Sequence, residues 1–301
     1  MSKAAPSAPM PALLPGERPD YDAPASLSRL LDFEGLAMSK RFGQNFLVNP
    51  GARAKILAEL GAAAGERIWE IGPGIGAMTA MALDAGLGVT AFEIDHGFAR
   101  LLCRVFGQEE NFSLVEGDFL DTWKSELDAA GLPAVIFGNL PYSAAAAIIA
   151  ALLEGGVLAR RMVFTVQKEA ARRMVSKPGT EDYSSFTVLC ASVCRVRLAF
   201  DLAGGSFWPA PRVTSSVVVM ESRPDPVLPQ ERRAFSRFVR SAFASRRKTL
   251  RNNLGAAGHS GDLVSALLAE FGIDPSIRAE ALSPESLAAI FSRLHSPAAS
   301  Q

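Results

Sequence analysis

Cysteine and histidine are scarce in this chain of 301 residues, which contains three of each. Their positions show neither the paired spacing of zinc ligands nor an even number of cysteines, so we expect no metal site and no disulfide framework. We interpret the three thiols as packing residues. They are Cys103, Cys190 and Cys194.

The sequence also lacks a hydrophobic run long enough to cross a membrane. The longest strongly apolar run, Ala144 to Leu153, ends at Glu154 and is far shorter than the ~20 residues that a bilayer requires. It predicts a buried helix. Nothing near the start combines a basic region, an apolar stretch and a cleavage site, so we expect a cytoplasmic protein without a membrane partner.

Net charge is absent as well, because 31 basic residues balance 31 acidic ones. The overall charge therefore gives no indication of a nucleic-acid partner, but its distribution does. Between Arg223 and Arg251 there are nine basic residues and only two acidic ones, a pattern typical of surfaces that bind phosphates. The alternative interpretation is the solvated face of an ordinary helix.

Residues 1–37 contain six prolines among alanine and serine, without helical or strand periodicity. We predict a flexible Pro/Ala-rich extension there. Beyond it, helices alternate with continuous apolar strands, which predicts a doubly wound, Rossmann-like α/β sheet within a domain of residues 38–222. The expected parallel strands are Arg67–Ile71, Gly88–Phe92, Phe112–Glu116, Ala134–Phe137 and Met162–Val166.

The end of the chain is organised differently. Two strands, Val193–Phe200 and Ser216–Met220, lie too close in sequence for a crossover helix, so we expect an antiparallel edge on the mostly parallel sheet. Residues 223–301 are predicted to form a small helical domain, because apolar residues recur there with helical spacing. The expected helices are Gln230–Phe243, Asp262–Phe271 and Pro284–Leu294.

The first motif with chemical meaning is Glu70-Ile-Gly-Pro-Gly-Ile-Gly-Ala-Met-Thr79, where the first strand ends and a helix begins. Gly72 and Gly74 let the backbone approach a ligand closely, and Glu93, at the end of the next strand, can accept hydrogen bonds from two ribose hydroxyls. These features predict a nucleoside cofactor. They also fit a dehydrogenase, or a turn that serves packing alone.

The second motif is Asn139-Leu-Pro-Tyr142, directly after the fourth strand. An exocyclic amino group on adenine is a poor nucleophile, because its lone pair is delocalised into the ring. Hydrogen bonds from the amine to the Asn139 side-chain oxygen and the Leu140 carbonyl would favour a pyramidal nitrogen, with Pro141 stiffening the loop and Tyr142 stacking on the base. The motif predicts methyl transfer to such an amine without a strong base, although a polar turn is the simpler interpretation.

Two more residues are expected to complete this pocket. Asp118 follows the third strand and is placed to contact the adenine of a cofactor, and Phe207 precedes the last strand. A bound base could be sandwiched between Tyr142 and Phe207, since stacking on an aromatic ring offsets the cost of flipping a nucleotide. We expect the neighbouring Trp208 to be a core aromatic.

From about Lys40 to Leu294 the chain resembles the small-subunit rRNA adenine dimethyltransferases of the KsgA type, relatives of the antibiotic-resistance rRNA methylases. Two motifs near the end of the chain, Arg247-Lys-Thr-Leu-Arg-Asn-Asn-Leu254 and Arg278-Ala-Glu-Ala-Leu-Ser283, favour the small-subunit enzymes over the resistance methylases. The motifs that carry the resemblance are Lys40-Arg-Phe-Gly-Gln-Asn-Phe-Leu47, Glu70-Ile-Gly-Pro-Gly74, Phe92-Glu-Ile-Asp95, Gly138-Asn-Leu-Pro-Tyr142, Gln167-Lys-Glu169, Lys177-Pro-Gly179, Phe207-x-Pro-x-Pro-Arg-Val-x-Ser215, Ala242-Phe-x-x-Arg-Arg-Lys248, Arg247-Lys-Thr-Leu-Arg-Asn-Asn-Leu254 and Arg278-Ala-Glu-Ala-Leu-Ser283.

The resemblance implies a class I methyltransferase that uses S-adenosylmethionine and no metal. It implies two methyl groups on the N6 atom of each of two adjacent adenosines near the 3′ end of 16S rRNA, in a nearly assembled small ribosomal subunit, by an enzyme that is monomeric when free. The implied cofactor contacts are Gln44, Asn45, Leu47, Gly72, Gly74, Glu93, Asp118 and Asn139. The catalytic residues would be Asn139, Leu140, Pro141, Tyr142 and Phe207, and the rRNA contacts Arg233, Arg237, Arg240, Arg246, Arg247 and Lys248.

The chain departs from the family pattern at two places. Four alanines follow Ser143 where the family usually has polar and β-branched residues, and the region Tyr183–Phe186 lacks the usual glycine. Three other hypotheses stay open: a dehydrogenase, a factor that mainly acts as a checkpoint in ribosome assembly, and a methyltransferase for large-subunit rRNA or DNA.

Overall fold

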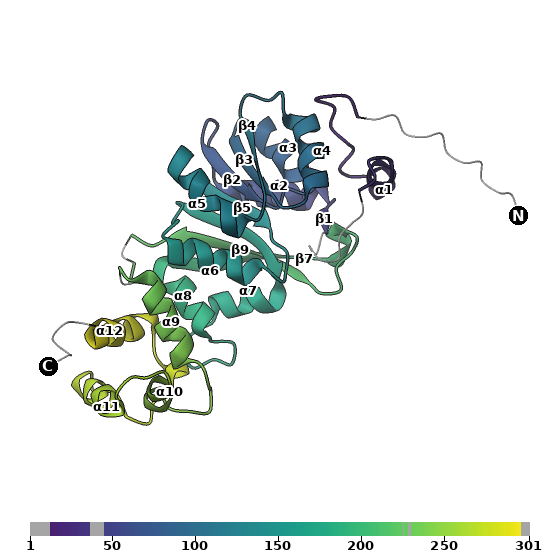
Figure 1. The fold of residues 1–301 in the computed structure, drawn as a ribbon. Helices are drawn as coiled ribbons and strands as arrows, with labels where there is room; N and C mark the ends of the chain where they lie inside the picture. Colours follow the sequence, from purple (N-terminus) through teal and green to yellow (C-terminus); the bar gives the residue numbers. More distant parts are fainter. Residues whose placement is uncertain (1–12, 37–44, 225, 228–229, 296–301) are drawn as a thin grey trace, which may run out of the picture.

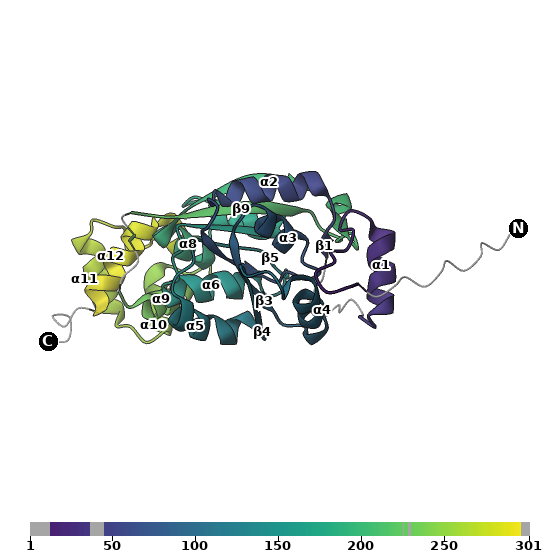
Figure 2. The same cartoon turned by 90° about the horizontal axis from the view of Figure 1, so that it is seen from above.

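The computed structural model describes residues 13–36, 45–224, 226–227 and 230–295. An α/β layer structure occupies the middle of the molecule, and a group of helices from the end of the chain lies at one end (Figure 1). The first helix, α1 (Pro24–Phe33), lies at the opposite end in both views (Figures 1 and 2).

Within the described residues, seven strands form the central sheet, in the order β4-β3-β2-β5-β6-β9-β7. The first five strands in this order are parallel to one another, and β9 is antiparallel to both of its neighbours. This confirms the Rossmann-like sheet with an antiparallel strand. The strands are β2 (Arg67–Ile71), β3 (Gly88–Glu93), β4 (Phe112–Glu116), β5 (Val135–Asn139), β6 (Arg161–Gln167), β7 (Cys194–Leu202) and β9 (Ser215–Ser222).

The direction in which the chain adds strands reverses at the centre of this sheet. From β2 it moves outward to β3 and β4, and then returns to the other side of β2 with β5. The loops that follow β2 and β5 therefore diverge at the carboxyl edge of the sheet, which is where open α/β sheets bind ligands.

Both faces of the sheet are covered, because successive residues of each strand point to opposite sides. In β5, Val135 and Phe137 pack into one core cluster and Ile136 into the other. The first cluster also contains residues of α2 (Pro50–Leu60), α3 (Ala77–Asp84) and α4 (His96–Phe106). The second contains residues of α5 (Phe119–Ala130), α6 (Ala145–Gly155), α7 (Lys168–Val175) and α8 (Ser185–Val193).

The last helices form a third core cluster, which also takes in Tyr183 and Val188. The three helices expected from the sequence are present, and the structure adds α10, whose two buried leucines give only a short apolar pattern. Thr249 caps α10 by accepting a hydrogen bond from the Asn252 N–H. The helices are α9 (Arg232–Ala242), α10 (Leu250–Ala256), α11 (Gly261–Glu270) and α12 (Pro284–His295).

The prediction of a flexible extension over residues 1–37 is wrong for residues 13–36, the part that the structure describes. Leu27, Leu30 and Leu31 of α1 are buried in the first core cluster. They follow the spacing i, i+3, i+4, and Pro24 occupies the first turn, where it costs no hydrogen bond. Packing against the α/β domain thus stabilises a helix that is too short to form alone.

The packing role predicted for the cysteines holds for two of them. Cys190 and Cys194 are buried, whereas Cys103 is exposed on α4. Within the described part of the chain, no helix is long and apolar enough to cross a membrane.

Candidate active site

A pocket lies at the carboxyl edge of the sheet, where the loops after β2 and β5 diverge. Its walls come from the glycine-rich turn, from Glu93 at the end of β3, and from the loop Asn139–Tyr142. A short strand, β1 (Phe46–Leu47), closes one side of the pocket and pairs antiparallel with β8 (Phe207–Trp208). The pocket thus brings together the two motifs that the sequence singled out.

The glycine-rich turn has a backbone that other residues rarely adopt. Gly72 and Gly74 have φ angles of 71° and 56°, which L-residues with a Cβ disfavour. A Cβ atom at Gly72 would meet nothing within 4 Å, whereas one at Gly74 would lie 3.0 Å from the ring of Phe46. The turn therefore leaves room for a ligand beside Gly72 and supports β1 at Gly74.

Glu93 presents a fixed carboxylate to the pocket. Its side chain is 4% exposed and accepts hydrogen bonds from the Gly74 N–H at 3.1 Å and the Asp95 N–H at 2.9 Å. Burial raises the pKa of Glu93 to about 7, although both hydrogen bonds oppose the shift. Because the two backbone donors hold the group in place, hydroxyl donors of a ligand would meet an acceptor that needs no reorganisation.

Glu70 also lines the pocket, although the sequence analysis assigned it no role of its own. It accepts a hydrogen bond of 2.6 Å from the Thr79 hydroxyl, and burial raises its pKa to about 8. The sequence did contain a signal for this residue. Glu70 is an acid within an otherwise apolar stretch of β2, just before the glycine-rich turn. Burial thus favours the protonated form of Glu70, which reduces the negative charge that this residue adds to the pocket.

The Asn139–Tyr142 loop is held by hydrogen bonds at both ends. The Asn139 side-chain NH₂ donates to the Asn45 carbonyl at 2.7 Å, and the Tyr142 hydroxyl lies 2.6 Å from the Ser215 Oγ. Leu140 is buried, and its N–H donates to the Thr165 carbonyl of β6. Since the Asn139 NH₂ group is engaged with Asn45, the amide oxygen is the atom left for a donor in the pocket.

Six of the eight predicted cofactor contacts line this pocket. They are Asn45, Leu47, Gly72, Gly74, Glu93 and Asn139. Asp118 does not line it; its side chain caps α5 by accepting a hydrogen bond from the Leu120 N–H at 2.9 Å. Gln44 lies outside the described residues.

Of the two aromatic residues of β8, Phe207 is placed contrary to expectation. Phe207 is 3% exposed and packs in the first core cluster, so the described pocket does not bring it against Tyr142. Trp208, which we expected to be a core aromatic, is half-buried; it packs against the first core cluster and contacts the Phe46 ring. Successive side chains of β8 turn to opposite sides, so Phe207 lies opposite Leu47 and Trp208 opposite Phe46.

The predicted basic surface spans α9 and the loop that follows it. Arg240 pairs with Glu154 at the end of α6, and Arg246 pairs with Glu280 at 2.9 Å. Among the residues that the structure describes, the other four predicted rRNA contacts are exposed and take part in no ion pair. They are Arg233, Arg237, Arg247 and Lys248.

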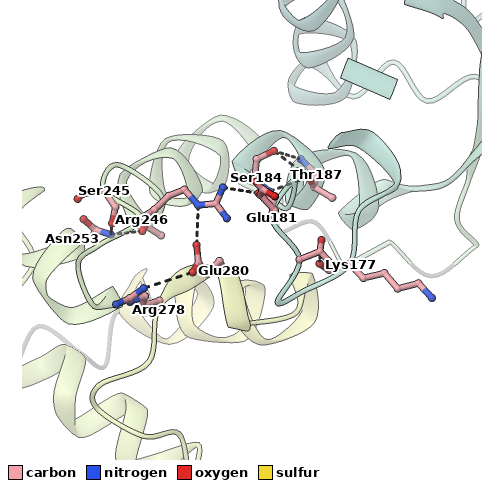
Figure 3. Close-up of polar contacts among 11 residues, drawn as sticks. Lys177, Glu181, Ser184, Thr187, Ser245, Arg246, Asn253, Arg278 and Glu280 are labelled. Carbon is pink, nitrogen blue, oxygen red and sulfur yellow. Dashed lines mark hydrogen bonds and ion pairs between the residues drawn. The ribbon is translucent and has the colours of Figure 1, made fainter. Parts of the chain in front are cut away.

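The loop between α9 and α10 has a defined shape. The buried Asn253 side chain donates to the carbonyls of Ala242 and Ser245, at 2.7 and 3.0 Å. Arg246 also donates to the Glu181 carbonyl at 2.5 Å, so its guanidinium lies between two acceptors (Figure 3). These contacts fix the backbone that carries the exposed Arg247 and Lys248.

Comparisons with known proteins agree with these motifs. Residues 35–296 match the family Ribosomal RNA adenine dimethylase, so the whole of α1 lies before the match. A Ribosomal RNA small subunit methyltransferase A from Treponema denticola is 41% identical over 270 residues, which cover 88% of this chain and 92% of the relative. A protein of the same name from Deinococcus radiodurans is 38% identical over 290 residues, 95% of each chain.

Solved structures share the fold. A dimethyladenosine transferase from Plasmodium falciparum superposes with a TM-score of 0.68 at 22% identity, covering 80% of this chain and 94% of that one. The 23S rRNA methyltransferase ErmE gives 0.59 at 24% identity, covering 84% and 100%. Since the family match includes the glycine-rich turn, the Asn139–Tyr142 loop and the helical end of the chain, this protein belongs to the ribosomal RNA adenine dimethylase family.

Proposed function

We propose that this chain transfers methyl groups from S-adenosylmethionine to the N6 atoms of two adjacent adenosines near the 3′ end of 16S rRNA. The observation that carries the proposal is the Asn139 carboxamide, whose NH₂ group is bound to Asn45 and whose oxygen is left for an amine. Two relatives that match most of this chain are named as small-subunit rRNA methyltransferases, which supports small-subunit rRNA as the substrate.

The pocket fits the nucleoside part of this cofactor. The open space beside Gly72 accommodates a ligand against the backbone, and the Glu93 carboxylate can accept hydrogen bonds from both ribose hydroxyls. When bound, S-adenosylmethionine supplies a methyl group on a sulfonium centre, which is electrophilic without a metal ion. On the family resemblance we also assign contacts to Gln44 and to Asp118, the latter with the cofactor adenine.

On the substrate side, the loop after β5 activates the amine. The Asn139 oxygen and the Leu140 carbonyl accept hydrogen bonds from the amino protons and favour a pyramidal nitrogen, whose lone pair then points toward the methyl group. Pro141 stiffens the loop, and Tyr142 stacks on the flipped base. Methylation makes the nitrogen acidic, so its proton passes to water without a strong base, and a second transfer can follow.

The role of Phe207 as a second stacking partner conflicts with its position, because Phe207 is buried in the first core cluster. A sandwich of the base between Tyr142 and Phe207 requires Phe207 to leave that core when rRNA binds. Without this movement, Tyr142 stacks on one face of the base only.

For substrate binding we assign the basic surface to the rRNA backbone. Arg233, Arg237, Arg247 and Lys248 are exposed on it, and Arg240 and Arg246 can exchange their carboxylate partners for phosphates. The enzyme then acts in the cytoplasm as a monomer on a nearly assembled small subunit and contributes to subunit biogenesis.

The other hypotheses predict different behaviour. A dehydrogenase would leave the Asn139–Tyr142 loop without a role and does not fit the family. A pure assembly factor would bind subunits without transferring methyl groups. A methyltransferase for large-subunit rRNA or DNA would ignore the small subunit.

The direct test incubates the protein with labelled S-adenosylmethionine and small subunits from cells that lack this dimethylation. Mass-spectrometric mapping should then find dimethyladenosine at two adjacent positions near the 3′ end of the 16S rRNA. Binding without transfer would support the assembly-factor hypothesis. Transfer only to large-subunit RNA or DNA would replace the proposed substrate.

Cofactor affinity should decrease as the pH falls below about 7, because the pKa of Glu93 is raised to about 7 by burial. Ribose hydroxyls bind the ionised carboxylate, so binding is strongest above this pKa and weakens about tenfold for each pH unit below it. Calorimetry with S-adenosylmethionine from pH 5.5 to 8.5 measures the effect.

The control for this prediction is Glu93→Gln, which removes the titrating group and keeps its size. Its affinity should be lower at pH 8 and should change little between pH 5.5 and 7. If the unaltered protein has the same affinity as Glu93→Gln at every pH, Glu93 does not bind the ribose.

A further inference from the structure

We propose that the segment before the catalytic domain clamps the cofactor-binding strand β1 at Tyr21 and Asp22, with Arg53 as the positioning residue between them. The inference rests on the proposed cofactor site. In Figures 1 and 2, α1 lies beside β1 at the end of the molecule remote from the basic surface.

Arg53 is a charged residue in the interior of the protein. It lies in the first turns of α2 and is only 5% exposed. An isolated guanidinium loses much of its hydration in such a place, so it requires hydrogen-bond acceptors and a nearby negative charge. An arginine on a helix usually finds both in solvent; here the partners come from the N-terminal segment and from β1.

The partners of Arg53 link the N-terminal segment to the pocket wall. One amino group of its guanidinium donates to the Leu47 carbonyl at 2.9 Å and to the Tyr21 carbonyl at 3.4 Å. The other pairs with the Asp22 carboxylate. Among the described side chains, Asp22 alone forms an ion pair with Arg53.

The strand that Arg53 holds is part of the cofactor pocket. Phe46 and Leu47 both line it, and the Phe46 ring lies against the glycine-rich turn at Gly74. Just before β1, the Asn45 carbonyl accepts the Asn139 side-chain NH₂. In addition to its pairing with β8, the backbone of β1 is thus held by the catalytic loop at Asn45 and by Arg53 at Leu47.

Asp22 therefore influences the cofactor without touching it. Its carboxylate orients the guanidinium, which in turn holds the Leu47 carbonyl and the pocket-lining face of β1. Without Asp22, Arg53 keeps a buried charge that only neutral carbonyls solvate, and other arrangements of the Arg53 side chain become competitive. The empty pocket would then lose part of its preorganisation for the cofactor.

The test compares Asp22→Asn with Glu34→Gln. Each change neutralises one carboxylate of the same N-terminal segment, but Glu34 pairs with Arg104 on α4, and in the described part of the chain no hydrogen bond or ion pair joins it to β1. We expect Asp22→Asn to raise the Kd for S-adenosylmethionine about five- to tenfold. The KM for the cofactor should rise with it, and kcat at saturating cofactor should stay within about twofold.

A second readout follows β1 directly. Amide hydrogen exchange over residues 45–49, measured without cofactor, should be faster in Asp22→Asn than in Glu34→Gln. An unchanged Kd for Asp22→Asn, or an equal increase for Glu34→Gln, would overturn the clamp. Failure of the unaltered protein to bind S-adenosylmethionine would instead overturn the proposed function, and the clamp with it.

Discussion

Replacing Asn139 by alanine should reduce kcat for methyl transfer by a factor on the order of 10² to 10³, the usual effect of removing one preorganised polar group at a reacting centre. Two losses contribute. The amine loses the oxygen that favours its pyramidal form, and the Asn45 carbonyl loses the hydrogen bond that ties the catalytic loop to β1. The rate is measured in single turnovers with saturating cofactor and undermethylated small subunits.

Asn139→Asp separates the two losses. Aspartate keeps an acceptor for the amine but offers no NH₂ group to the Asn45 carbonyl, so it should also raise the KM for the cofactor through β1. Alanine and aspartate variants that both bind small subunits normally would place the defect in the chemical step. A kcat for Asn139→Ala within tenfold of the unaltered enzyme would contradict the assigned role.

The strands of the central sheet could be predicted because of their hydrophobicity. Parallel strands buried on both faces are continuous in apolar residues, and these runs are visible in the sequence. The errors lie at strand ends, as in β5, which was expected over Ala134–Phe137 and runs over Val135–Asn139. Asn139 is polar and yet belongs to the strand, so hydrophobicity alone placed the end too early.

The helices that were missed depend on packing partners. In α1 only three leucines mark the buried side, and prolines around them suggested an irregular chain. The short α10 has two buried leucines, Leu250 and Leu254, in seven residues. Both helices become stable against a core whose composition the local sequence does not reveal.

For the site, motifs predicted the pocket wall better than the direction of single side chains. Gly72, Glu93 and Asn139 lie at the carboxyl ends of strands in one sheet, so their convergence follows from topology. The burial of Phe207 depends on its pairing with β1, a strand about 160 residues away in the sequence. Arg53 gave no signal at all, because its position on a helix does not disclose that it is buried.

Binding to undermethylated small subunits should weaken steeply with salt. If about six phosphates are neutralised, the log–log slope is about −5, so raising salt from about 50 to about 200 mM costs on the order of a thousandfold in affinity. Neutralising Arg247 and Lys248 together, both as Gln, should make the slope shallower by about two units, since each exposed cation contributes about one. Filter binding across this salt range measures both slopes.

The matched control for this variant is Arg29→Gln with Arg100→Gln, which removes the same charge from exposed positions on α1 and α4. If Arg247 and Lys248, in the loop between α9 and α10, bind phosphates directly, the slope changes in their double variant and not in the control. Equal slopes for both double variants would mean that the loop acts through overall charge alone, and the assignment of the rRNA contacts to it would be wrong. Because Asn253 and Glu280 hold the loop from within, loss of the two exposed cations should leave its fold intact.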